Sequence, residues 1–168
     1  MNRIAKFEKV SYEQFAAAFK EEFSKSDEET LKVYESIKLP RRATAGSAGY
    51  DFYTPVNIRL EPHQTIKIPT GIRAKMNSDW VLMIYPRSGL GFKFRLQLNN
   101  TVGVIDSDYY NSDNEGHIFI KITNDSNEGK VVDVAEGGGF AQGIFMPYGI
   151  TEDDDVTDAR NGGFGSTG

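Results

Sequence analysis

HIFIKIT, at residues 117–123, alternates isoleucines with other side chains at a period of two. This alternation predicts a β-strand whose Ile118, Ile120 and Ile122 face a buried core. Further stretches rich in β-branched residues lie on both sides of it, separated by Gly, Pro, Asn and Asp clusters: VNIRL (56–60), QTIKIP (64–69), WVLMIYP (80–86) and KVVDV (130–134). Many short strands joined by turns are typical of a β-sandwich, jelly roll or barrel, so we expect a mainly β fold.

The residues before this strand-rich region carry helix signals instead. Ser11 with Gln14 matches a capping box, and apolar side chains follow at helical spacing up to residue 24. Ser26 with Glu29 gives a second capping signal, and Pro40 ends the region. We therefore expect a helical N-terminal extension at 1–36, a β domain at 37–150, and an acidic linker with a Gly-rich C-terminal arm at 151–168.

The composition narrows the class of protein. The chain has 168 residues, of which 39% are hydrophobic and 26% charged, as in a soluble globular domain with a real core. The net charge of −5 argues against binding nucleic acid through its phosphates. The absence of cysteine rules out disulfides and cysteine-ligated zinc deaminases. We see no apolar run suited to a leader or a membrane span, so we expect a cytoplasmic protein with no membrane partner.

Several common binding-site motifs are absent from the sequence. The C-terminal stretch RNGGFGSTG (160–168) has two possible interpretations. There is no Walker A motif, and an EF-hand beginning at Asp106 would place Tyr110 in a ligand position. His63 and His117 stand without a ligand-spaced neighbour and are predicted to be surface or packing residues. The C-terminal stretch is either a loose tail or a loop whose backbone N–H groups converge on an anion.

Five stretches carry the candidate chemistry: SAGYDF (47–52), PRSGLGFK (86–93), NTVGVIDSDYY (100–110), GGFAQGIF (138–145) and GGFGSTG (162–168). Taken singly, each has an ordinary explanation as a turn, a capped loop or a bulged strand. Together, and in this order, they resemble the five motifs of the trimeric deoxyuridine triphosphate nucleotidohydrolase (dUTPase) family. The resemblance covers about residues 37–168 and implies a jelly-roll-like β-barrel, a homotrimer, and active sites shared at subunit interfaces.

The resemblance also implies a reaction and its machinery. dUTP would be hydrolysed to dUMP and pyrophosphate, which limits uracil incorporation into DNA and supplies dUMP for dTMP synthesis. Asp106 would act as general base on the water that attacks the α-phosphorus, and Mg²⁺ would bind the triphosphate. Asp51 would hold the water shell of the metal or brace an arginine. The phosphates would be bound by Arg87, Ser88, Gly89 and Gln142.

Selection of the nucleoside is assigned by the same resemblance to the third motif. The amide of Asn100 would pair with the uracil edge, helped by the backbone of Gly103, Val104 and Ile105. Tyr109 would lie against the deoxyribose and leave no room for a 2′-hydroxyl.

The C-terminal arm would close over a site built by other subunits. Phe164 would stack on uracil, Arg160 would meet the outer phosphates, and the remaining phosphate contacts would come from Gly165, Ser166 and Thr167.

Three features depart from the family pattern. YNSDNEG (110–116) intervenes after Tyr109 and predicts a surface insertion. Gly139 stands where a basic residue is often found, and Arg160 is shifted relative to the usual arginine of the fifth motif. The N-terminal helix and the 110–116 insertion are candidate surfaces for a protein partner.

Three alternatives remain at this stage. A dCTP deaminase of the same fold would carry a Glu in its site and lack the stacking Phe of the arm, so Asp106 and Phe164 favour hydrolysis. A nucleotide-sensing regulatory protein, or a plain β-barrel binding module, would need no catalysis.

Overall fold

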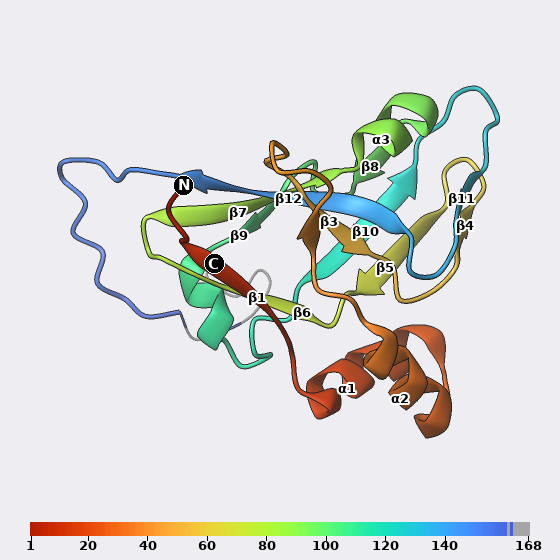
Figure 1. The fold of residues 1–168 in the computed structure, drawn as a ribbon, viewed down its shortest axis with the longest axis horizontal. Coiled ribbons are helices and arrows are strands. Elements are labelled where there is room, and N and C mark those ends of the chain that lie inside the picture. The colour runs from red at the N-terminus through yellow and green to blue at the C-terminus, as the bar shows by residue number, and fades with distance from the viewer. Residues whose placement is uncertain (161, 163–168) are drawn as a thin grey trace.

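The structure is a computed structural model that describes residues 1–160 and 162. It is mainly β, with α1 and α2 side by side below the sheets and α3 at the opposite end of the molecule (Figure 1). Its elements in chain order are β1 (Ala5–Lys9), α1 (Tyr12–Phe23), α2 (Asp27–Ser36), β2 (Arg41–Arg42), β3 (Tyr50–Tyr53), β4 (Ile58–Leu60), β5 (Thr65–Pro69), β6 (Ile72–Met76), β7 (Trp80–Pro86), α3 (Ser88–Phe94), β8 (Leu96–Leu98), β9 (Gly103–Ile105), the 3₁₀ helix η1 (Ser107–Asn111), β10 (Phe119–Asn124), β11 (Val132–Val134) and β12 (Gly139–Pro147).

Within the described residues the strands form separate small sheets. Five strands are ordered β2-β3-β12-β7-β9, three are ordered β5-β10-β8, and β1-β6 and β11-β4 form pairs. All of the pairings are antiparallel, so turns and hairpins suffice to connect many of the strands. The hydrogen bonding does not close around these sheets, so the mainly β prediction is confirmed while a closed barrel is not seen among them.

The alternation in 117–123 has the predicted consequence. Ile118, Ile120 and Ile122 are each at most 1% exposed, and they join a core shared by all the sheets. Lys121, on the other face of β10, is exposed. All five predicted strands are present, as β4, β5, β7, β10 and β11.

The N-terminal helices begin where the capping signals place them. Ser11 caps α1 and accepts a hydrogen bond from the Gln14 backbone, and Ser26 with Glu29 forms a complete capping box at α2. Phe15 and Phe19 are fully buried in a small core of their own below the sheets. The strand β1, which has no strong alternation, is not predicted from sequence. It pairs with β6 and places Phe7 in the main core, so residues before α1 belong to the sheet structure.

A buried histidine joins the helices to the sheets. The side chain of His117 is 0% exposed, and its Nε2 accepts a hydrogen bond of 2.8 Å from the Gly71 backbone N–H. Gly71 has φ +72°, and a Cβ there would lie 2.4 Å from Ile37 Cδ1, so this turn requires glycine. The ring of His117 packs against Phe119 and Phe15, which confirms a packing role. Burial lowers its pKa from 6.5 to about 4.

We expect the free energy of unfolding to fall by about 2 kcal/mol between pH 7 and pH 5 because of His117. Its pKa is lower in the folded chain, so its contribution is complete above pH 6.5 and is lost as the pH falls toward 4. His117→Gln keeps an acceptor for the Gly71 N–H but cannot titrate, so its curve should be much flatter over this range. Urea unfolding at each pH measures this, with the exposed His63→Gln as control. An unchanged slope in His117→Gln would contradict the assignment.

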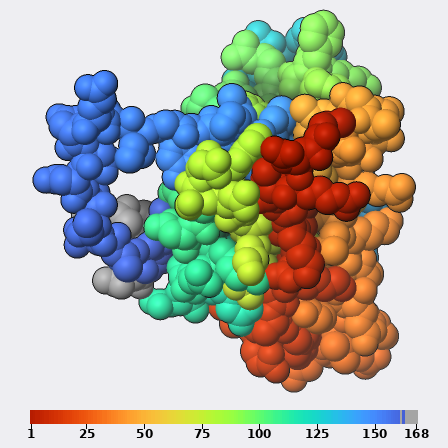
Figure 2. Space-filling view, turned by 60° about the vertical axis from the view of Figure 1, so that its left-hand side comes forward, coloured from red at the N-terminus to blue at the C-terminus, as the bar shows by residue number. Residues whose placement is uncertain are grey.

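The chain after β12 leaves the body before it returns. Residues 149–159 stand off the sheets as an extended segment, and the acidic stretch 151–155 lies in its outer part (Figure 2). Arg160 then contacts the residues that follow β9. No helix in the described part of the chain is long and apolar enough to cross a membrane.

Candidate active site

One set of predicted site residues lies where β3, β12 and the end of β7 run side by side. We call it the β12 group; its members are Asp51, Arg87, Ser88, Gly89 and Gln142. Gln142 stands opposite Asp51 on β3 and opposite Tyr85 on β7 in the register of the sheet. Its side-chain N–H donates a 3.1 Å hydrogen bond to the Pro86 carbonyl. A Cβ at Gly49 would lie 2.6 Å from the Gln142 amide oxygen, so Gly49 gives this side chain its room.

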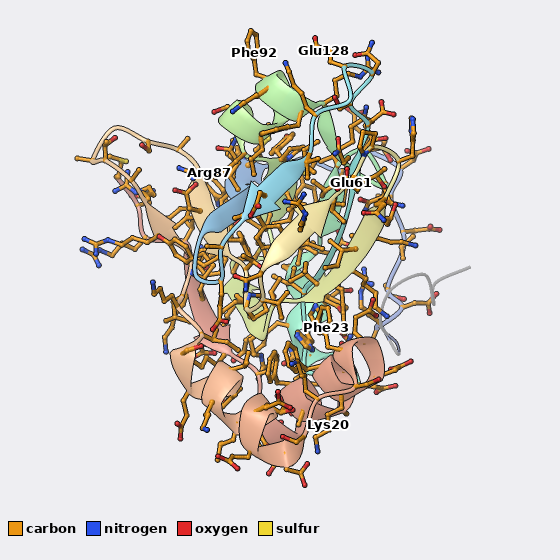
Figure 3. All side chains as sticks on the ribbon, turned by 90° about the vertical axis from the view of Figure 1, so that its right-hand side faces the viewer. Lys20, Phe23, Glu61, Arg87, Phe92 and Glu128 are labelled. Carbon is orange, nitrogen blue, oxygen red and sulfur yellow. The ribbon has the colours of Figure 1, made fainter. Side chains whose placement is uncertain are left out.

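The guanidinium of Arg87 is held in place by a carboxylate. Arg87 Nε lies 3.2 Å from Asp51 Oδ1, and the Asp51 side chain is only 18% exposed. Arg87 itself is exposed, as are Ser88 and Gly89, which begin α3. The three therefore face solvent together at the start of α3, whose Phe92 projects at the end of the molecule far from Lys20 and Phe23 of α1 (Figure 3).

Gly139 has a packing role at this place. A Cβ at Gly139 would lie 3.1 Å from Arg87 Nη1 and 3.2 Å from its Cδ. A larger residue would therefore press on the Arg87 side chain where it crosses β12. The missing basic residue of the fourth motif leaves space for the arginine of the second.

A second set of predicted residues surrounds β9. We call it the β9 group; its members are Asn100, Gly103, Val104, Ile105, Asp106 and Tyr109. Asn100, Gly103 and Ile105 line a cavity of about 390 Å³, whose apolar wall includes Leu98 and Phe119. A Cβ at Gly103 would lie 3.0 Å from Ile84 Cβ, so glycine lets β9 approach β7 closely.

Asp106 and Tyr109 follow directly after β9. The Asp106 side chain is 52% exposed, which leaves its carboxylate open to water. Tyr109 is 4% exposed; its hydroxyl donates a 2.7 Å hydrogen bond to the His117 carbonyl, and burial raises its pKa. The two side chains thus combine an open carboxylate with a fixed aromatic ring.

Arg160 of the C-terminal segment lies on this group. Its Nη2 is 2.5 Å from Asp106 Oδ2, its Nε is 2.8 Å from Asp108 Oδ1, and its guanidinium carbon is 5.8 Å from the centre of the Tyr109 ring. The arginine predicted to meet phosphates is thus bound to the predicted general base. The arm residues Phe164, Gly165, Ser166 and Thr167 lie outside the described residues.

The two groups lie toward opposite ends of β7. Leu82 pairs with Ile105, so Asp106 is aligned with Val81, whereas Arg87 follows Pro86 at the other end. Six residues of extended strand separate Val81 from Arg87, a distance of about 20 Å. Within one chain the backbones at Asp106 and Arg87 therefore lie about 20 Å apart along β7.

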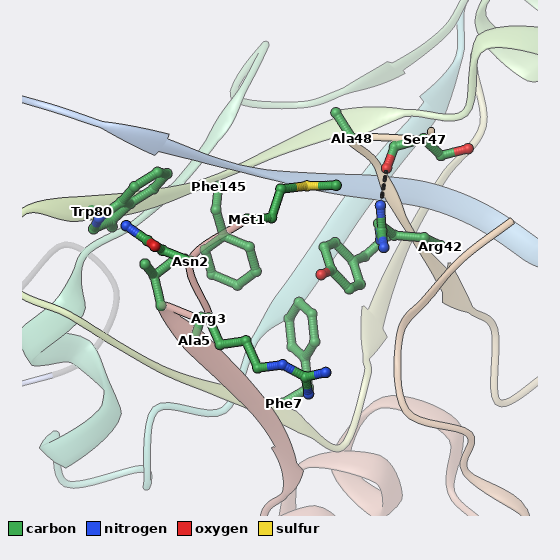
Figure 4. A pocket seen from close by; sticks show the side chains of 12 residues that line it. Met1, Asn2, Arg3, Ala5, Phe7, Arg42, Ser47, Ala48, Trp80 and Phe145 are labelled. Atoms are coloured by element: carbon green, nitrogen blue, oxygen red, sulfur yellow. Dashed lines mark hydrogen bonds between the residues drawn. The ribbon is translucent and has the colours of Figure 1, made fainter. Parts of the chain in front are cut away.

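A larger hollow lies elsewhere. It measures about 690 Å³ and is bordered by the first residues of the chain, Arg42, Trp80 and Phe145 (Figure 4). Arg42 donates hydrogen bonds to the Ser47 and Ala45 carbonyls, which fix its wall. None of the predicted site residues lines it.

The carboxylates near the predicted site fit a metal ion that binds together with a phosphate-bearing substrate. Among the residues described, no group of three or more His, Asp or Glu side chains could hold a metal by itself. Mg²⁺ commonly keeps several waters and binds through one or two carboxylates together with substrate phosphates. Asp51 is paired with Arg87, and its two roles, in the water shell of the metal or as a brace for the arginine, stay predictions.

Comparison with protein-family models identifies the family of this chain. The dUTPase model matches residues 35–168. The chain belongs to the dUTPase family. Deoxyuridine 5'-triphosphate nucleotidohydrolase of Lactococcus lactis subsp. lactis (strain IL1403) is 43% identical over 135 residues, covering 79% of this chain and 89% of that protein. The protein of the same name from Escherichia coli (strain K12 / DH10B) is 37% identical over 145 residues, covering 82% and 91%.

Solved dUTPase structures agree with the fold. The dUTPase from Streptococcus mutans has a TM-score of 0.61 and 33% identity, covering 87% of this chain and 98% of that chain. The dUTPase from phage phi11 of S. aureus has a TM-score of 0.63 at 20% identity, covering 93% and 97%, and this likeness concerns the fold alone. Residues 1–34 precede the part that the dUTPase model matches.

The structure adds residues to the dUTPase motifs that the sequence did not single out. Asn114, Phe119 and two lysines also line the 390 Å³ cavity. Phe119 and Lys121 fall on the face of β10 opposite the isoleucines, and an aromatic ring on an otherwise polar face is the signal that could have indicated them. The segment 110–116 is not simply a surface insertion, since Ser112 is 7% exposed and Gly116 is buried.

Proposed function

We propose that this chain hydrolyses dUTP to dUMP and pyrophosphate with the residues of the β9 and β12 groups. The observation that carries the assignment is the half-exposed carboxylate of Asp106, directly after a strand whose residues line the cavity. The membership of the chain in the dUTPase family indicates that the substrate is dUTP.

In this proposal the uracil enters the 390 Å³ cavity. Asn100 pairs with the base edge, and the backbone of Gly103, Val104 and Ile105 completes the pairing. The ring of Tyr109 lies under the deoxyribose, where a 2′-hydroxyl would collide with it. Cytosine is rejected because its amino group would leave buried groups unpaired.

Asp106 orients a water molecule and accepts its proton. The water oxygen bonds to the α-phosphorus, and the bond from that phosphorus to the bridging oxygen breaks, so the electron pair leaves with pyrophosphate. Arg87, with the backbone and hydroxyl donors of Ser88 and Gly89 and the amide of Gln142, binds the phosphates. Mg²⁺, when bound to the triphosphate, offsets its negative charge, and Asp51 keeps Arg87 oriented.

We propose a homotrimer in which neighbouring chains share each site. The separation of about 20 Å along β7 supports sharing, because Asp106 of one copy must meet Arg87 of another to act on one triphosphate. The jelly-roll-like arrangement is proposed on the same family grounds. In the described residues Arg160 of the arm contacts Asp106 and Asp108 of its own chain, and Phe164 with residues 165–167 would close over a neighbour.

The direct test is pyrophosphate release from dUTP, dCTP, UTP and dTTP measured in parallel with Mg²⁺. We expect release from dUTP alone. Ammonia from dCTP would move the chain to the deaminase branch of the fold. Tight binding of dUTP without release would indicate a regulatory protein.

Arg160→Ala should weaken binding of the outer phosphates without affecting binding of the nucleoside. The arginine is expected to leave Asp106 and Asp108 for the outer phosphates, so its loss should weaken binding of a non-hydrolysable dUTP analogue about 10- to 100-fold. dUMP lacks those phosphates and should bind as well as before. Calorimetry with both ligands measures this; equal weakening would place Arg160 at the nucleoside instead.

A further inference from the structure

The Tyr109 ring is held by more than its own strand. Its hydroxyl donates to the His117 carbonyl and accepts a hydrogen bond of 2.7 Å from the Asn114 side-chain N–H. With both bonds made, the hydroxyl has both a donor and an acceptor as partners. The direction of the phenol ring is thereby fixed from behind.

Asn114 is itself fixed by the turn in which it lies. Its side-chain oxygen accepts from the Gly116 N–H at 3.2 Å, and its carbonyl accepts from the His117 N–H at 3.0 Å. Gly116 has φ +70°, and a Cβ there would lie 2.7 Å from the Tyr109 carbonyl. Glycine therefore lets this turn lie directly against the backbone of Tyr109.

Glu115 ties the same turn to the N-terminal extension. Its two carboxylate oxygens accept from the Ser11 N–H at 2.7 Å and from the Ser11 hydroxyl at 2.6 Å. These hydrogen bonds hold the pKa of Glu115 below its usual range. Glu115 also has φ +58°, which a glutamate rarely adopts and which persists only where the surroundings determine it.

A second tie runs from Tyr110 to β1. The Tyr110 hydroxyl donates to Glu8 Oε2 at 2.5 Å, and its carbonyl accepts from Arg73 Nη2 at 2.7 Å. The Arg73 guanidinium stacks on the Tyr110 ring at 3.6 Å. Residues 8–11 thus hold the chain on both sides of the turn.

We propose that Asn114 and Glu115 are positioning residues that set the selectivity for deoxyribose over ribose. Asn114 holds the Tyr109 hydroxyl, and Glu115 anchors the Asn114 turn to Ser11 at the start of α1. The inference rests on the proposed function, in which Tyr109 excludes the 2′-hydroxyl. It gives the N-terminal extension and the 110–116 segment one shared purpose.

The test compares kcat/KM for dUTP with kcat/KM for UTP. Asn114→Ala should lower this ratio about tenfold, chiefly because kcat/KM for UTP rises when Tyr109 no longer excludes the 2′-hydroxyl. The kcat for dUTP should change little, because Asp106 is untouched. In a Tyr109→Phe background, which lacks the hydroxyl, Asn114→Ala should change the ratio less than about twofold. A loss of folded protein would lower both rates equally and leave the ratio unchanged.

Glu115 offers a conservative rescue. Glu115→Ala should lower the ratio, whereas Glu115→Gln should restore most of it, because an amide can still accept from the Ser11 N–H and donate to the hydroxyl. The exposed Asp113→Ala, in the same turn, should leave the ratio unchanged.

Binding of dUMP and UMP by calorimetry tests the proposal without turnover. Asn114→Ala should reduce the preference for dUMP by the same factor. If the wild-type chain released no pyrophosphate from dUTP, the proposed function would fail. The ratio of dUMP affinity to UMP affinity would still test the positioning role of Asn114. A preference for dUMP that is unchanged in Asn114→Ala, or absent in the wild type, would overturn the proposal.

Discussion

Asp106→Asn is expected to lower kcat for dUTP by about 100- to 10 000-fold. The amide keeps the shape of the side chain and an acceptor for Arg160, but it cannot take a proton from water. KM should change little, because the base and sugar are bound by other residues. Pyrophosphate release under saturating dUTP measures the loss, and dUMP binding shows that the site remains intact.

Asp108→Asn is the matched control. Both carboxylates bind Arg160, at 2.5 Å and 2.8 Å, so either substitution disturbs the arginine to a similar degree. Only Asp106 is proposed to contact the attacking water. Equal losses in the two variants would assign Asp106 to anchoring the arm and remove it as general base.

Two inactive variants should recover activity when they are assembled together. Asp106→Asn and Arg87→Ala damage groups that lie about 20 Å apart along β7. If each site takes Asp106 from one copy and Arg87 from another, random mixing should leave about one quarter of the sites intact. Unfolding an equal mixture in urea and refolding it, followed by the dUTP assay, measures this.

As controls, each variant is refolded alone. Asp106→Asn refolded alone should show less than about one per cent of wild-type kcat. A mixture no more active than the mean of the two variants would mean that both groups act within a single chain. In that case the register of β7 with β9 and β12 would have to change on binding.

The pattern in 117–123 predicted the core because one face of β10 is buried and the other is not. The helix starts at Ser11 and Ser26 were equally readable, since capping is a local interaction of three or four residues. β1 was missed because AKFEK pairs on only one side and buries mainly Phe7. α3 was missed because two glycines in SGLGFKF hide the helical pattern.

The motif resemblance names the candidate site residues, and the structure places those that it describes in two separate groups. The sequence spacing of Arg87 and Asp106 does not show that β7 separates them, because this separation follows from the register of β9 on β7. Asn114 could not be predicted either, since its role depends on a turn that contacts a tyrosine five residues earlier. The arginine at 160 was named, but its contact with Asp106 requires the return of the chain from residue 148.

The bonds from Ser11 to Glu115 also order events during synthesis. The two residues are 104 positions apart, so at about 5–20 residues per second Ser11 leaves the ribosome roughly 5–20 s before its partner exists. β1 waits as well, because β6 lies beyond both helices. During that interval β1 is an open strand edge, and its charged Lys6, Glu8 and Lys9 are the kind of side chains that discourage pairing with another nascent chain.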